Sequence, residues 1–161
     1  MNGYRSGFLY SQSSQVLKAY NGIAHFSMMS NDTQYAVTQL LSDQAWLEDF
    51  LERNKHEVYA SYTAMTQILE DASIPYLPCY CALFLLLDLR QWLESDSFEA
   101  ESKLHNRIFE EARVVLVPGK DMCADCPGLF RLCFTATPRD WLITGLTRIC
   151  DYLKLHASKR K

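Results

Sequence analysis

VVLVPGKDMCADCPGLFRLCF, residues 114–134, contains two short apolar runs separated by a polar loop. The first run, Val114–Val117, is rich in β-branched residues and stops at Pro118-Gly119. Pro127-Gly128 then turns the chain into the second run, Leu129–Phe134. Apolar runs of this length between Pro-Gly turns are typical of strands. The pattern therefore predicts a β-hairpin.

Arg131 lies in the middle of the second apolar run. A guanidinium group is always charged and carries a planar fork of donors. Burying it between Phe130 and Leu132 is therefore costly unless a carboxylate or phosphate meets it. We expect Arg131 to receive the carboxylate of a ligand. The alternative is an ion pair with a local acid such as Asp125 or Asp140.

The composition is that of an ordinary globular protein. The chain has 161 residues, of which 48% are hydrophobic and 22% charged, and this is enough for one domain with a real core. The net charge of -3 gives no electrostatic reason to expect a nucleic-acid partner. The longest apolar run, Ala82–Leu87, is too short to cross a bilayer, and the N-terminus shows no signal pattern. We expect a cytoplasmic protein without a membrane partner.

The six cysteines are expected to be reduced thiols, because no secretory signal accompanies them. Four of them, Cys79, Cys81, Cys123 and Cys126, could form the two halves of a zinc site. However, a Cys-x-Cys pair in an extended strand points its thiols to opposite faces. We therefore expect no metal site. The histidines are scattered and lack a partnered nucleophile pattern, so no hydrolase is indicated.

Hydrophobic periodicity predicts the remaining elements. The run Cys79–Leu89 is apolar on both faces and is expected to be a buried central strand. Ser42-Asp43 is expected to cap a long helix, and the acids between residues 98 and 112 are expected to form a solvated face. Helices are predicted over residues 13–26, 30–41, 44–71 and 98–112 and from Thr137 onward, and a short strand over residues 3–11.

Two arginine motifs resemble those of the class I and II aminotransferases, specifically the branch around 1-aminocyclopropane-1-carboxylate synthase. In that branch a strand and a Pro-Gly loop lead to Gly-x-Phe-Arg-x-Cys-Phe, which residues 128–134 match. The resemblance implies that Arg131 holds the α-carboxylate of an amino-acid substrate. Cys81-Ala82-Leu83-Phe84 resembles the family's Ala-Gly-Leu-Phe, with Ala82 at a position where the family often has glycine.

The N-terminal residues resemble the family's cofactor motif. Gly3-Tyr4-Arg5-Ser6-Gly7 matches its second half, which implies that Arg5 binds the phosphate of pyridoxal 5'-phosphate. In the family a lysine upstream of this arginine forms the Schiff base with the cofactor. Its position would precede Met1, so we expect the chain to lack a catalytic residue of this kind.

The resemblance covers nearly the whole chain and implies an α/β fold, the C-terminal portion of a fold-type-I pyridoxal-phosphate-dependent transferase. Residues 1–43 would be a remnant of the large cofactor-binding domain and residues 44–73 a long interdomain helix. Residues 74–161 would form an α+β small domain, a short and mostly antiparallel sheet flanked by helices.

The function implied is that of the C-terminal part of an enzyme acting on an amino acid, by transamination or by α,γ-elimination. Without the lysine the chain is expected to be inactive alone. Family enzymes are dimers, which implies a homodimer or pairing with a homologous subunit. The alternative is a non-catalytic binding or regulatory module that pairs with a full-length homologue.

Overall fold

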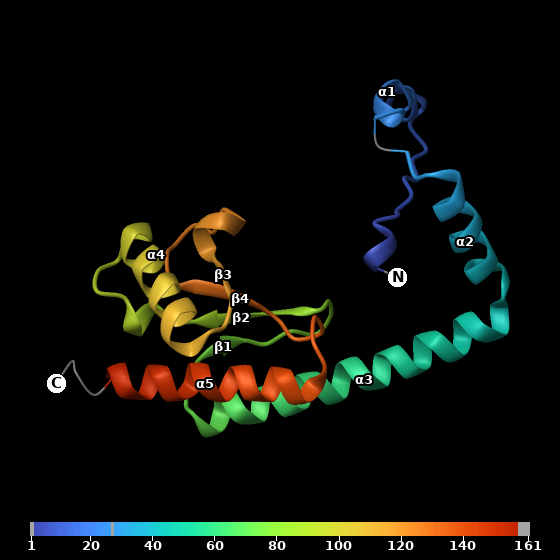
Figure 1. Cartoon of the computed structure of the whole chain (residues 1–161). Coiled ribbons are helices and arrows are strands. Elements are labelled where there is room, and N and C mark those ends of the chain that lie inside the picture. Colours follow the sequence, from blue (N-terminus) through green and yellow to red (C-terminus); the bar gives the residue numbers. More distant parts are fainter. Residues whose placement is uncertain (1, 27, 158–161) are drawn as a thin grey trace. The chain divides into compact units, whose positions relative to one another are not determined.

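The computed structural model describes residues 2–26 and 28–157 (Figure 1). The chain divides into two compact units, Met1–Arg53 and Asn54–Lys161. Their boundary falls inside the long helix α3, Gln44–Asp71. Each unit is described separately below.

The first unit is helical. Its described residues form the short 3-10 helix η1 (Asn2–Tyr4), then α1 (Ser14–Ala24), α2 (Asn31–Ser42) and the beginning of α3. Both predicted helices are confirmed. Their N-caps are serines, because the Ser13 side chain accepts the Val16 N–H and that of Ser30 accepts the Thr33 N–H at 3.2 Å.

The prediction of a strand over residues 3–11 is wrong. After the turn at Asn2–Tyr4 the chain is irregular up to Ser13, and the described residues include no strand partner for it. A strand is defined by backbone pairing with a neighbour, and an apolar pattern alone does not make one. The side chain of Phe8 is accordingly 96% exposed.

The long helix begins and ends where its periodicity predicts. Asp43 caps it, since its Oδ1 accepts the N–H of Trp46 at 3.0 Å. In the second unit, α3 buries Met65 and Leu69 completely. These two residues lie four apart and therefore share one face of the helix, which packs into the core.

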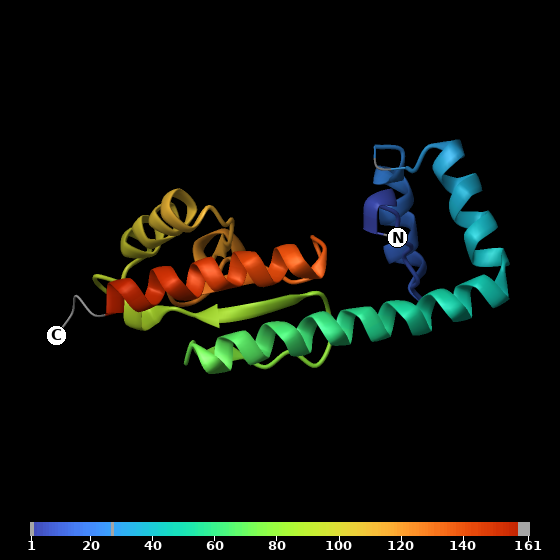
Figure 2. The same ribbon diagram turned by 60° about the horizontal axis from the view of Figure 1, so that its bottom comes forward.

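The second unit contains a four-stranded sheet in the order β1-β2-β4-β3 (Figures 1 and 2). Every neighbouring pair of strands is antiparallel, as expected. The strands are β1 (Tyr76–Leu77), β2 (Phe84–Asp88), β3 (Val117–Pro118) and β4 (Leu129–Cys133).

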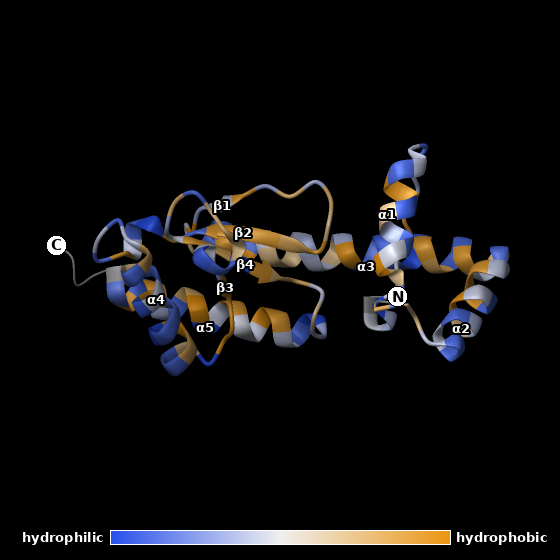
Figure 3. Cartoon of the chain, turned by 90° about the horizontal axis from the view of Figure 1, so that it is seen from above, coloured by the Kyte–Doolittle hydropathy of each residue, from blue (hydrophilic) through white to orange (hydrophobic). Residues whose placement is uncertain are grey.

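The central strand is shorter and less buried than predicted. β2 covers Phe84–Asp88, whereas residues 79–83 form bends, with Ala82 in the left-handed region at φ 75°. Leu85 and Leu87 are buried, but Phe84 and Leu86 on the other face are not. Because apolar side chains occur on both faces of this strand, the sequence did not show that one face of the sheet is open. Figure 3 shows most of β2 in the colour of hydrophobic residues, and the strand ends at the charged Asp88.

The closed face of the sheet packs against helices. These are α4 (Phe98–Arg107), its π-helical continuation η3 (Ile108–Ala112) and α5 (Arg139–Ala157), together with α3. An ion pair of 2.5 Å between Arg139 and Glu57 joins α5 to α3. The buried side chains include Leu85, Leu87, Phe130, Leu132, Ile108, Leu116, Leu146, Ile149 and Leu153. No described helix has the length and apolar character needed to span a bilayer.

Candidate functional site

Arg131 occupies the open face of the sheet. In β4 it pairs with Leu86 of β2 on one side and with Val117 of β3 on the other. Phe130 and Leu132 are buried on the opposite face, because successive residues of a strand point to opposite sides. The inference that Arg131 is buried between these two neighbours is therefore wrong. The arginine is half-buried, so its charge does not have to be neutralised within the core.

The guanidinium of Arg131 lies over an aromatic ring. Its Cζ is 4.7 Å from the centroid of the Phe84 ring, which is a cation–π arrangement. Among the described residues no carboxylate forms an ion pair with Arg131, so neither Asp125 nor Asp140 takes that role. The ring leaves the donors of the guanidinium free for an incoming anion. Arg131 and Phe84 together form the candidate carboxylate site.

Glu101 of α4 holds the loop that leads into β4. Its side chain is fully buried, and its Oε1 accepts the N–H of Lys120 at 2.9 Å. Its Oε2 accepts the N–H of Gly128 at 2.6 Å. The expectation that the acids of this helix are solvated is wrong for Glu101. Both ends of the polar loop are tied to one carboxylate.

The turn at Gly128 starts the strand that carries Arg131. Gly128 has a φ of 94°, which favours glycine, and its C=O accepts the N–H of Leu89 at 2.8 Å. A Cβ at this position would lie 2.7 Å from Cγ of Arg90. Arg90 donates from Nε and Nη2 to Asp88 at 2.8 and 2.6 Å and so holds the pKa of that carboxyl below its usual value. The packing around this turn fixes the register of β4.

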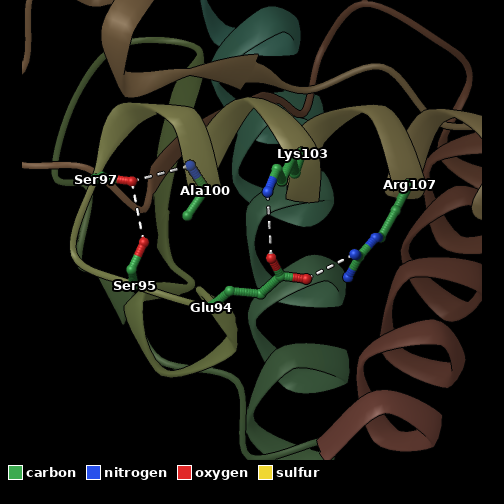
Figure 4. Close-up of polar contacts among 6 residues, drawn as sticks. All are labelled: Glu94, Ser95, Ser97, Ala100, Lys103 and Arg107. Atoms are coloured by element: carbon green, nitrogen blue, oxygen red, sulfur yellow. Dashed lines mark hydrogen bonds and ion pairs between the residues drawn. The ribbon is translucent and has the colours of Figure 1, made fainter.

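A second charged cluster surrounds Glu94 near the start of α4 (Figure 4). Its carboxylate lies 2.6 Å from Nη2 of Arg107 and 3.7 Å from Nζ of Lys103. The Arg107 hydrogen bond lowers the pKa of Glu94. Ser97 caps the helix by accepting the N–H of Ala100 at 3.2 Å. These contacts connect the segment before α4 to the helix itself.

Arg5 lies in the first unit and is considered by itself. It is exposed, and none of the ion pairs between described residues includes it. It lines a cavity of 510 Å³ with Gly7, Phe8, Tyr20 and other residues. The arginine is therefore accessible to an anion, with aromatic side chains beside it.

No metal centre emerges from the described residues, which contain no group of three or more His, Cys, Asp or Glu side chains able to hold an ion. The Cys79 thiol donates to the carbonyl of Cys81. Cys133 is half-buried on the same face as Arg131, whereas Cys150 is buried, which raises the pKa of its thiol.

Sequence reasoning did not identify Phe84 or Glu101 as contributors to this site. Phe84 is one of several apolar residues in its run, and only the register of β2 against β4 brings it to Arg131. Glu101 is one of several acids in its helix, and nothing in the sequence distinguishes it from the others. The available signal was that the two Pro-Gly turns contain backbone N–H groups that need an acceptor once they are buried.

The structure matches part of two solved fold-type-I aminotransferases. The structure aligns over 94% of its length with an aspartate aminotransferase mutant of Thermus thermophilus, at 26% identity and a TM-score of 0.75, covering 39% of that chain. It also aligns over 96% of its length with an aromatic aminotransferase of Pyrococcus horikoshii, with a TM-score of 0.80 at 21% identity, covering 40% of that chain.

Sequence comparisons define the family. The family model "Aminotransferase class I and II" matches residues 1–149, so this chain belongs to that family. It is 35% identical over 94% of its length to 1-aminocyclopropane-1-carboxylate synthase 11 of Arabidopsis thaliana, and 30% identical over 98% to synthase 9 of the same plant. The chain spans 33% and 34% of the lengths of these two relatives.

Proposed function

We propose that this chain acts as the C-terminal part of a pyridoxal-phosphate-dependent enzyme of the aminotransferase or aminocyclopropane-carboxylate-synthase type, and that Arg131 binds the α-carboxylate of its amino-acid substrate. The observation that carries the proposal is the state of Arg131. It is half-buried on the open face of the sheet and lies 4.7 Å over the Phe84 ring, without an ion-pair partner among the described residues.

A bidentate contact between a guanidinium and a carboxylate fixes both the position and the orientation of an amino acid. Phe84 limits the freedom of the Arg131 side chain from one side. Glu101 and Gly128 determine where β4 begins and so position the arginine. The same contact would serve transamination or α,γ-elimination, since both begin with an α-amino acid held by its carboxylate.

Arg5 is the proposed ligand of the cofactor phosphate. The residues around it fit that group, because Arg5 is exposed and lines the 510 Å³ cavity together with Phe8 and Tyr20. When bound, pyridoxal 5'-phosphate supplies an electron sink for the electrons left at the substrate Cα. The role of Arg5 is to bind and orient the phosphate through charge-assisted hydrogen bonds.

The chain by itself is proposed to be inactive. The family motif has its Schiff-base lysine before the glycine-rich segment that contains Arg5. Lys18 in α1, the next lysine in this sequence, is exposed and matches nothing in the motif. The chain with added cofactor and amino acid should therefore give no transamination above the rate of free cofactor.

Side-chain NMR of the 161-residue chain tests the role of Arg131. L-methionine should shift the Arg131 Nε–H resonance, whereas the amine that lacks the carboxylate, methylthiopropylamine, should not. Arg131→Lys should weaken the binding of L-methionine by about tenfold, because a lysine cannot form the planar bidentate contact. Arg53→Lys, at an exposed arginine paired with Asp49, is the matched control. Equal shifts with the two ligands would rule out carboxylate recognition by Arg131.

A second function, pairing with a full-length homologue, is favoured by one observation. None of the described side chains from residue 3 to residue 53 is buried, and large apolar ones such as Phe8, Tyr10, Ile23 and Phe26 are widely exposed. Exposed apolar surface of this extent is typical of an interaction site. Sedimentation of the chain mixed with a full-length aminocyclopropane-carboxylate synthase should show a complex. Two unchanged separate species would exclude this role.

A further inference from the structure

A second cavity lies within the second unit, between α5, the end of β4 and the irregular residues 113–115 that follow η3. Its volume is 620 Å³, and its apolar lining includes Val114, Leu132 and Trp141. Trp141 as a residue is 71% exposed although it lines the cavity. We call this space the α5 cavity. Neither Arg131 nor Phe84 lines it, so it is separate from the carboxylate site proposed above.

The charged residues that line the α5 cavity are all basic. Arg113 and Arg148 line it, and no acidic residue does. Both arginines are exposed, and neither forms an ion pair with a described residue. Other arginines of the same unit do have carboxylate partners, as Arg107 has Glu94 and Arg139 has Glu57. The two unpaired guanidinium groups therefore create a positive potential at an apolar hollow.

We propose that the α5 cavity binds an amphipathic carboxylate, with its apolar body against Trp141 and Leu132 and its anionic group at Arg113 and Arg148. The cavity volume falls within the range usual for small-molecule sites, and an apolar lining with a few polar groups is their common composition. A purely ionic ligand would leave the apolar lining unused. A neutral apolar ligand would leave both charges without a partner.

Gly145 offers a way to close the cavity. It lies in α5 and lines the cavity, and a Cβ at this position would be 3.6 Å from Cγ2 of Val114, an ordinary contact. A small side chain is therefore accepted there, and a longer one would extend into the space. Gly145→Met should fill the cavity while the helix remains intact, because methionine is a good helix former.

The test is a titration of the full chain, followed by the indole N–H resonance of Trp141, which is assigned with Trp141→Phe. Phenylbutyrate should shift this resonance in a saturable manner. Phenylbutanol, which lacks the charge, should bind at least about tenfold more weakly, as expected for a lost charge-assisted contact. Acetate, which lacks the apolar body, should cause no saturable shift.

Variants locate the site. The double variant Arg113→Gln with Arg148→Gln should weaken phenylbutyrate binding by at least about tenfold. Lys154→Gln removes an exposed cation of α5 that does not line the cavity, and it should change the affinity by less than about twofold. A folded Gly145→Met variant, checked by thermal unfolding, should lose binding. Equal binding of acid and alcohol, unchanged affinity in the double variant, or unchanged affinity in Gly145→Met would each overturn the proposal.

Discussion

Glu101 and Gly128 are 27 residues apart in the chain, and the fully buried carboxylate of the first accepts the backbone N–H of the second at 2.6 Å. The other carboxylate oxygen accepts the N–H of Lys120 at 2.9 Å. One side chain of α4 thus ties together both ends of the loop that leads into the strand of Arg131. Buried polar groups satisfied in this way specify a single arrangement, and losing one partner is costly.

Glu101→Gln should lower the free energy of unfolding by about 2 kcal/mol or more. The amide keeps one acceptor oxygen but presents an N–H₂ group to the second backbone N–H, which is left unsatisfied in the core. Urea unfolding measures the loss. Glu99→Gln, at an exposed acid of the same helical turn, is the control and should cost less than about 1 kcal/mol. Equal effects of the two substitutions would contradict the role given to Glu101.

Two glycine-to-alanine substitutions should have opposite signs. Gly128→Ala should destabilise the chain by at least about 2 kcal/mol, because its φ is 94° and the new Cβ would lie 2.7 Å from Cγ of Arg90. Gly145→Ala should stabilise it by up to about 1 kcal/mol, because alanine is the better helix former and meets Val114 at 3.6 Å. Urea unfolding of both variants measures the two changes in the free energy of unfolding. A stabilising effect of Gly128→Ala would contradict the described turn.

Ala82→Gly should stabilise the protein by about 0.5 to 1 kcal/mol. Ala82 has a φ of 75°, a conformation that costs a residue with a Cβ about 1 to 2 kcal/mol, and the greater entropy of glycine in the unfolded chain offsets part of the gain. Ala60→Gly inside α3 should destabilise by about 1 kcal/mol. If both substitutions destabilise equally in urea, Ala82 does not have the described conformation.

Tyr76 should lose its hydroxyl proton at a higher pH than an ordinary tyrosine does. Its hydroxyl donates to Glu70 Oε1 at 2.8 Å, and this hydrogen bond to a carboxylate raises the pKa of Tyr76 from 10.0 to about 12. The folded state therefore favours the neutral phenol. Its contribution to stability is complete below pH 10.0 and is lost as the pH rises through about 12. The difference in tyrosinate absorbance between the wild type and Tyr76→Phe gives this titration.

Glu70→Gln is the matched variant for that titration. It removes the negative charge and keeps an acceptor oxygen, so the pKa of Tyr76 should fall toward its ordinary value of 10.0. An unchanged titration in Glu70→Gln would mean that the carboxylate is not the cause of the shift.

Local patterns predicted the helices well. The apolar spacing between Gln44 and Asp71 and the capping Asp43 determine α3, and the structure has the same bounds. The helices α1 and α2 also begin within one residue of the predicted positions 13 and 30. Helical periodicity and capping depend on residues within a few positions of one another, so the sequence contains the whole signal.

The strands were predicted less well, because pairing is not local. The two-residue strand β1 was missed, and the strand expected over residues 3–11 is absent from the described structure. In the run that contains Arg131, apolar residues occupy both alternating faces, and the pattern did not show which face is covered. Only the packing of α4, α5 and α3 on one side makes Phe130 part of the core and leaves Arg131 on the other face.

Part of the candidate site could likewise be predicted from the sequence, and part depends on the tertiary structure. By itself the sequence determined that Arg131 lies in an apolar strand after a Pro-Gly turn and that Arg5 lies between Gly3 and Gly7. These motifs were enough to indicate the family. The tertiary structure alone decided that Phe84 lies under the guanidinium and that Glu101 secures the turn. Motifs are set by neighbours in the chain, whereas these two contacts depend on strand register and helix packing, which join residues 47 and 27 positions apart.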